Sequence, residues 1–222
     1  MKKRTFERGL PGGYRLEKQL DAKSFGFGLL LSLGSLILFA IALIPVVAPL
    51  YFVDEIAVAD SLWDQIDLIM LIYLGGTLVY TILHELTHGA AYKIMTGEKL
   101  TFGISWNCAF CGVPRIFTYR RTALIAVYAP FVLFSVIFIP LLVWFYFSNM
   151  VLYIALGLIF ATHVSGCIGD LYMGHLLLHR YTDRHTLVND TGPCVSIFTF
   201  NPNSIERDYD TIKFVENMDK KK

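Results

Sequence analysis

Four long apolar runs, separated by short polar segments, set the pattern of this sequence. They cover roughly residues 25–53, 66–91, 122–147 and 150–178, and each reaches the roughly 20 residues that an α-helix needs to cross a bilayer. Backbone N–H and C=O groups in lipid must pair within their own segment, so helices are the expected structure. The pattern therefore predicts an all-α polytopic membrane protein with four transmembrane helices.

Shorter segments alternate apolar and polar positions with the period of a strand. Residues 100–106 have this pattern, and residues 113–119 are expected to return antiparallel, which would make a small interfacial β-hairpin. Its open edge could hold an extended peptide by strand addition; a loop without a substrate role is the alternative. The tail is expected to form two short strands within residues 186–200, around the turn residues 189–192.

Basic residues lie at one end of the predicted helices. Of the 19 Lys and Arg residues, seven precede the first helix, five lie between the second and third, and seven follow the fourth. The positive-inside rule then places both termini in the cytoplasm of a multi-pass cell-membrane protein. The expected organisation is a basic cytoplasmic N-terminus over residues 1–24, a transmembrane domain over 25–180, and a cytoplasmic tail over 181–222.

Composition agrees with a membrane protein and narrows the partners. Apolar residues make up 55% of the 222 residues and the mean hydropathy is +0.54, so lipid must serve as part of the solvent. The net charge of +1 gives no reason to expect nucleic acid. The four cysteines are expected on the cytoplasmic side or in the membrane, where thiols stay reduced. Cys108 and Cys111 have the spacing of half a zinc knuckle, but without a second pair they are more simply interpreted as ordinary loop thiols.

The second apolar run contains the pentapeptide His84-Glu85-Leu86-Thr87-His88. Residues four apart share a helix face, so both imidazoles can bind one Zn²⁺ ion. Such an ion polarises a carbonyl and lowers the pKa of a bound water, and Glu85 is displaced around the helix, as a general base should be. Core-packed histidines in a chance pentapeptide are the alternative. Ionisable side chains at bilayer depth are costly unless paired, which favours metal binding.

A catalytic zinc usually has three protein ligands, and four residues of the last apolar run are candidates for the third. Asp170 lies ten residues before Arg180, and His84 lies nine residues before Lys93, so both are expected about 14 Å from their basic anchors. His163 would lie about 10 Å deeper, and His179 would lie at the surface. Asp170 is therefore the expected ligand. His163 and His175 are the alternatives, and His163 could instead act beside the ligands or contact substrate.

The HELTHG sequence in one apolar helix, followed by Gly169-Asp170 in a later one, resembles the intramembrane site-2 protease group. More narrowly, it resembles a bacterial family of membrane zincin peptidases. The resemblance implies one zinc held by His84, His88 and Asp170, with Glu85 catalytic, in a metalloprotease-like transmembrane domain. Better-known site-2 proteases have an Asn-Pro-Asp-Gly type of signature around the third ligand, which residues 165–170 replace here.

Three functions follow from these residues. The leading hypothesis is a zinc metalloendopeptidase that cleaves a membrane-associated protein near the cytoplasmic face. The alternatives are an intramembrane metal transporter or proton relay, and a scaffold that keeps zinc only for folding. The first and third apolar runs have no charged residue in their cores, which disfavours a polar path across the membrane.

Overall fold

Four helical spans organise the chain. The computed structural model describes residues 4–52, 63–105, 109–201 and 209–219. Within them, four spans are long and apolar enough to cross a membrane: Phe25–Tyr51, Ile66–Thr96, Arg120–Ser148 and Met150–Arg180. The predicted plan of four such helices with small antiparallel strands is confirmed.

The individual helices follow these spans closely, with one interruption. Helix α1 (Phe25–Val47) continues as a 3-10 turn, and α3 (Ile66–Thr96) and α4 (Arg120–Ser148) are each continuous. The fourth span was expected to be one helix over residues 150–178. It is instead α5 (Met150–Gly166), then α6 (Ile168–His175) and a π-helical turn (Leu176–Arg180), with a break at Cys167. Glycines on both sides of the break lower the helix propensity there.

By internal packing the chain divides into two units. Helices α3 and α4 each belong partly to one unit and partly to the other. One unit comprises Leu30–His84 and Pro130–Asp170, and its described residues form mainly apolar helical segments. The other comprises Met1–Leu29, Glu85–Ala129 and Leu171–Lys222 and carries the strands. The unit boundary on α3 falls between His84 and Glu85.

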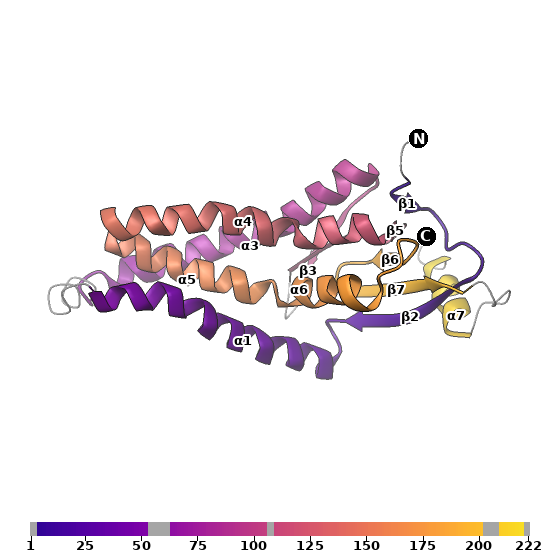
Figure 1. Cartoon of the computed structure of the whole chain (residues 1–222), viewed down its shortest axis with the longest axis horizontal. Helices are drawn as coiled ribbons and strands as arrows, with labels where there is room; N and C mark the ends of the chain where they lie inside the picture. The colour runs from indigo at the N-terminus through magenta and orange to yellow at the C-terminus, as the bar shows by residue number, and fades with distance from the viewer. Residues whose placement is uncertain (1–3, 53–62, 106–108, 202–208, 220–222) are drawn as a thin grey trace. The chain divides into compact units, whose positions relative to one another are not determined.

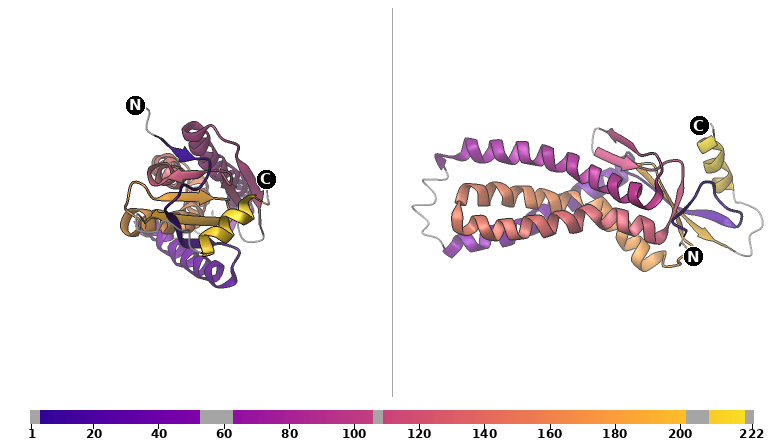
Figure 2. Two further views of the ribbon diagram at one scale, coloured as in Figure 1. Left: turned by 90° about the vertical axis from the view of Figure 1, so that its right-hand side faces the viewer. Right: turned by 90° about the horizontal axis from the view of Figure 1, so that it is seen from above.

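The helical unit is held by side chains from three helices. Tyr80 of α3, Phe134 and Phe138 of α4 and Ile159 of α5 form one buried cluster, and these helices lie side by side (Figures 1 and 2). Many large apolar side chains on α1, α3 and α4 stay exposed, which suits a surface that faces lipid rather than water.

The other unit is built on an antiparallel five-stranded sheet with the order β1-β5-β6-β7-β2. Residues on β6 and β7 alternate between its two faces: Leu187 and Phe198 pack in one buried cluster, Val188 and Ile197 in another. The helix α7 (Tyr209–Asp219) covers the first face (Figure 1). The strands are β1 (Phe6–Glu7), β2 (Tyr14–Asp21), β5 (Phe117–Tyr119), β6 (Leu187–Asp190) and β7 (Cys194–Phe200).

The small hairpin exists, but with a different second strand from the one predicted. Strand β3 (Thr101–Ile104) pairs antiparallel with β4 (Ala109–Gly112). The expected partner, residues 113–119, instead contributes β5 to the larger sheet, between β1 and β6. A nearby partner closes a shorter loop. Val113 and Ile116 are buried in a cluster with Tyr92 and Ala126, and Phe117 begins β5. The two predicted tail strands are confirmed as β6 and β7, whereas β1 and β2 were not predicted.

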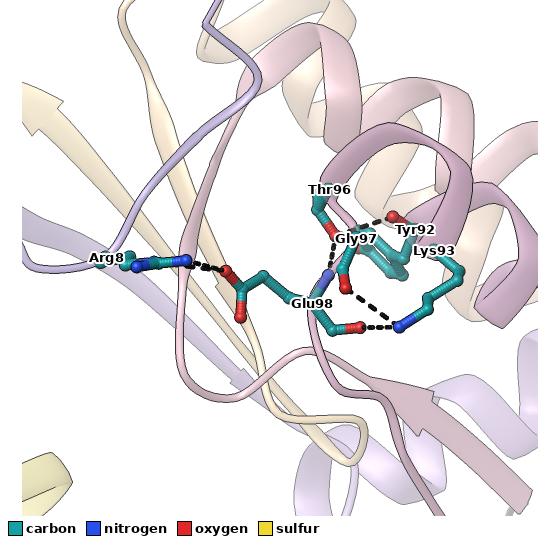
Figure 3. A network of polar contacts seen from close by, with 6 residues as sticks. All are labelled: Arg8, Tyr92, Lys93, Thr96, Gly97 and Glu98. Atoms are coloured by element: carbon teal, nitrogen blue, oxygen red, sulfur yellow. Dashed lines mark hydrogen bonds and ion pairs between the residues drawn. The ribbon is translucent and has the colours of Figure 1, made fainter.

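Polar contacts terminate α3 just after the pentapeptide (Figure 3). Gly97 has φ +72°, a left-handed conformation that ends a helix at low steric cost. Lys93 Nζ donates to the carbonyls of Gly97 and Glu98, at 2.9 and 3.2 Å, which satisfies acceptors at the helix end. Arg8, which follows β1, donates to Glu98 Oε1 at 3.1 Å. The N-terminal segment is thereby linked to the end of the motif helix.

Gly112 supplies a test of this packing, because β4 runs against the β6–β7 turn there. A Cβ atom on Gly112 would lie 2.9 Å from the Asp190 carbonyl oxygen and even closer to the backbone of residues 191 and 192. We expect Gly112→Ala to lower the stability of the detergent-solubilised protein by about 1–3 kcal/mol, because backbone must move.

Thermal unfolding followed by intrinsic fluorescence measures this loss. Gly12→Ala is the matched control, because nothing lies within 4 Å of its Cβ position. Equal melting temperatures for the two variants would contradict the close approach at Gly112.

Candidate metal centre

The pentapeptide lies wholly inside α3, which runs from Ile66 to Thr96. His84 and His88 therefore share one face of a continuous helix, one turn apart. Both side chains are buried, each 8% exposed, and Glu85 is half-buried. Two buried imidazoles in an apolar helix require polar partners, and the structure identifies partners for both.

His84 is paired with Asp170, within the helical unit. Its Nε2 lies 3.3 Å from Asp170 Oδ2. Asp170 is in the first turn of α6, just after the break at Cys167. The contact agrees with the equal depths expected from the helix counts. His163, which the helix count places about 10 Å deeper than His84, contacts the same Tyr80 hydroxyl as His84 does.

The distance between His84 Nε2 and Asp170 Oδ2 is the one expected for two ligands of the same metal ion. A charge-assisted hydrogen bond between these groups would normally be about 2.7–2.9 Å long. Two ligand atoms at 2.0–2.1 Å from one tetrahedral zinc are about 3.3–3.4 Å apart. The observed 3.3 Å matches the second value, and a nitrogen with a carboxylate oxygen is a donor set that zinc accepts.

His88 is oriented by a backbone carbonyl within the other unit. Its Nδ1 lies 2.8 Å from the carbonyl oxygen of Ala126 on α4. A carbonyl can only accept, so the proton of the neutral imidazole is on Nδ1 and the lone pair is on Nε2. Histidines that ligate zinc commonly donate their second N–H to a carbonyl or carboxylate in this way.

His163 lies among aromatic side chains and contacts the hydroxyl of Tyr80. It is fully buried, at 0% exposure. Its Nδ1 is 2.9 Å from Tyr80 Oη, and the same hydroxyl is 2.8 Å from His84 Nδ1. His84, His163 and Cys167 also form a group whose potential ligand atoms lie within 4.8 Å of one another. Sequence reasoning missed Tyr80, although its position four residues before His84 is the spacing of a shared helix face.

The remaining histidines of the fourth span lie in the strand-bearing unit. The rings of His175 and His179 are 4.7 Å apart between centroids, at the π-helical turn. Among the described residues, the groups able to hold a metal contain neither of them.

Cys111 is a buried neutral thiol near the motif. Burial raises its pKa to about 12, and the carboxylates of Asp190 and Glu85 add to the shift. A thiol with that pKa is protonated at neutral pH, and among the described residues no metal-capable group includes it. Its predicted partner Cys108 lies outside the described residues.

The hairpin packs directly on the motif helix. A Cβ atom on Gly89, the residue after His88, would lie 2.7 Å from the Phe102 ring and 3.1 Å from Leu100. Gly89 therefore allows β3 to approach α3 closely. In the described part of the chain, β3 pairs with β4 alone, so its other edge forms no strand pairing.

Residues 77–183 match a protein-family model described as "Putative zincin peptidase". Over these 107 of the 222 residues, the chain is similar to a zincin-like metallopeptidase family, a class that implies zinc. The matched segment contains the whole pentapeptide together with Tyr80, His163 and Asp170. Comparisons with curated proteins and with solved structures found no match.

The position of Asp170 gives a prediction about metal content. We expect Asp170→Ala to weaken zinc binding by more than about 100-fold, because it removes a direct ligand. His163→Ala should weaken it by about 10–100-fold, the range for residues that only support a ligand.

The variants are dialysed against a series of chelators, and the zinc that each one retains is measured by mass spectrometry. The retained zinc ranks the variants by affinity. Asp67→Ala, in the first turn of α3, is the control for loss of an acid elsewhere on an apolar helix. The reverse order, with His163→Ala the more severe, would show that the third ligand was chosen wrongly.

Proposed function

We propose that this protein is a membrane-embedded zinc metallopeptidase related to the intramembrane site-2 protease group. Its ligands would be His84, His88 and Asp170, and its general base Glu85. The observation that carries the proposal is the 3.3 Å contact between His84 and Asp170, on a helix that contains the complete HExxH pentapeptide. The zincin-peptidase match over residues 77–183 supports the same chemistry independently of geometry.

Glu85 and the residues around the proposed metal site would have separate roles in hydrolysis. A zinc ion, when bound, would polarise the substrate carbonyl and acidify a water molecule. Glu85 would accept a proton from that water as it attacks the carbonyl carbon, and would then give the proton to the leaving amine. One water is consumed, and the peptide bond becomes a carboxylate and an amine. The Ala126 carbonyl would keep the His88 ring in the orientation described above.

The substrate would be a membrane-associated protein cut near the cytoplasmic face. Glu85 lies in a helix apolar enough to span the membrane, which gives a segment already in the membrane easier access than a soluble peptide. The basic residues at the helix ends favour cytoplasmic termini in a multi-pass cell-membrane protein. Surrounding lipid would be the other partner. The open edge of β3, packed on α3 at Gly89, would hold the substrate as an added strand.

The alternative functions have less support. A transporter or proton relay needs polar groups along a path across the bilayer. Helix α1 contains no charged residue, and α4 contains none after Arg121. A zinc scaffold without catalysis would not need Glu85, which is retained within the pentapeptide.

Glu85→Gln tests the proposal most directly. It removes the base but neither imidazole, so we expect zinc content to be unchanged and cleavage to fall by about 10²–10⁴-fold. Cleavage is measured by comparing new N-termini of membrane proteins in cells that express each variant.

Glu98→Gln is the matched control, since Glu98 follows the same helix in an exposed ion pair with Arg8. Such a pair contributes about 0–1 kcal/mol, so this variant should cleave as the wild type does. Equal cleavage by the wild type and Glu85→Gln would remove Glu85 from the mechanism.

Proline substitutions along residues 101–105 test the role of β3. Each removes one backbone N–H, so those that face the open edge should impair turnover without loss of zinc. Alanine at Thr101 and Ile104, whose side chains are exposed, keeps the backbone donors and serves as the control. Full activity in every proline variant would exclude strand addition.

A further inference from the structure

The environment of His163 is apolar on nearly every side. Five aromatic rings surround its imidazole at centroid distances of 5.4 to 6.0 Å; they belong to Tyr80, Phe131, Phe134, Phe138 and Phe160. A buried imidazole in such surroundings is costly unless its nitrogens are hydrogen-bonded. Both have partners: Nδ1 contacts Tyr80 Oη at 2.9 Å, and Nε2 contacts Ser135 Oγ at 3.1 Å.

Tyr80 connects this imidazole to His84. Its hydroxyl lies 2.8 Å from His84 Nδ1, so it contacts the Nδ1 atoms of two histidines on two helices. A phenol carries one proton. It must therefore donate to one imidazole and accept from the other, and the direction is set by whichever histidine has a fixed tautomer.

The proposed metal ligation fixes that direction. His84 Nε2 faces Asp170, so if Nε2 is the ligand atom, the proton of the neutral ring is on Nδ1. Nδ1–H then donates to Tyr80 Oη, and the Tyr80 hydroxyl donates to His163 Nδ1. His163 in turn carries its proton on Nε2 and donates it to Ser135 Oγ. In this order each donor meets an acceptor.

We propose that Tyr80 is a positioning residue of the metal centre, and that His163 and Ser135 hold its hydroxyl in the orientation that accepts from His84. The inference rests on the proposed function, and assigns to Tyr80 the part that the Ala126 carbonyl has for His88. A backbone carbonyl carries no proton and can only accept a hydrogen bond. A tyrosine hydroxyl carries one proton, so it accepts from His84 only if that proton is donated to a second acceptor, which is His163.

A different arrangement uses the same atoms. His84, His163 and Cys167 have potential ligand atoms within 4.8 Å, and Cys167 Sγ lies 3.8 Å from His163 Nδ1. A metal held by that group would compete with Tyr80 for the two Nδ1 atoms. The two arrangements make opposite predictions for variants at Tyr80 and Cys167.

Tyr80→Phe separates positioning from packing, because it removes only the hydroxyl. Chelator competition with Zn²⁺ on the purified full chain should show affinity weakened by about 10–100-fold. The visible absorption of the Co²⁺-loaded protein should also change, since a reoriented imidazole alters the ligand field. Ser135→Ala should weaken Zn²⁺ binding in the same direction by less, and it is the second variant should Tyr80→Phe not fold.

Tyr73→Phe is the matched control. Tyr73 is on the same helix and its hydroxyl also reaches α5, at 3.2 Å from Thr162 Oγ1; among the described residues, no hydrogen bond or ring contact joins it to a histidine. The Tyr73→Phe variant should lose about as much thermal stability as Tyr80→Phe does. Its Zn²⁺ affinity and its Co²⁺ spectrum should equal those of the wild type.

The outcomes are distinguishable. A wild type that binds no zinc would overturn the proposed function together with this inference. A wild type that binds zinc, with Tyr80→Phe equal to Tyr73→Phe in affinity and spectrum, would overturn the inference alone. Cys167→Ala losing more zinc than Asp170→Ala would also overturn it, by assigning the metal to the group that contains the thiol.

Discussion

The structure depends on one constraint: ionisable side chains inside an apolar helix must have partners. Water satisfies such groups on a soluble protein, but a helix long and apolar enough to span a membrane has to find its partners in neighbouring helices. His84 finds Asp170 and Tyr80, and His88 finds the Ala126 carbonyl. Residues on α4 and α6 and on α3 itself thus provide the polar partners that the two imidazoles need.

The break at Cys167 has a clear consequence for the carboxylate. It ends α5 and restarts the chain as α6, with Asp170 in the first turn. An acidic side chain is favoured at that end of a helix, where backbone N–H groups lack intrahelical partners. Departure from a regular helix is therefore part of how a short carboxylate comes within 3.3 Å of His84.

Within the strand-bearing unit, the end of the motif helix contacts the sheet and the hairpin. Tyr92, one turn after His88, donates to Asp190 Oδ2 at 2.8 Å, and Asp190 also orders the turn between β6 and β7. The hairpin packs on Gly89 of the same helix turn. The hairpin therefore lies against the turn of α3 that follows Glu85.

The sequence by itself determined the four apolar helices and the pentapeptide, and counting along the chain predicted the level that Asp170 shares with His84, because each depends on length or spacing along one chain. The ligand set as a whole stays a prediction. Tertiary structure decided the strand pairing: residues 113–119 were expected in the hairpin but belong to the larger sheet, since strand partners depend on which buried surfaces are available. It also decided the roles of Tyr80 and His163. Depth counting placed His163 away from the metal, whereas a tyrosine hydroxyl spans the gap between the two histidines, and only the packing of α3 against α5 brings those atoms together.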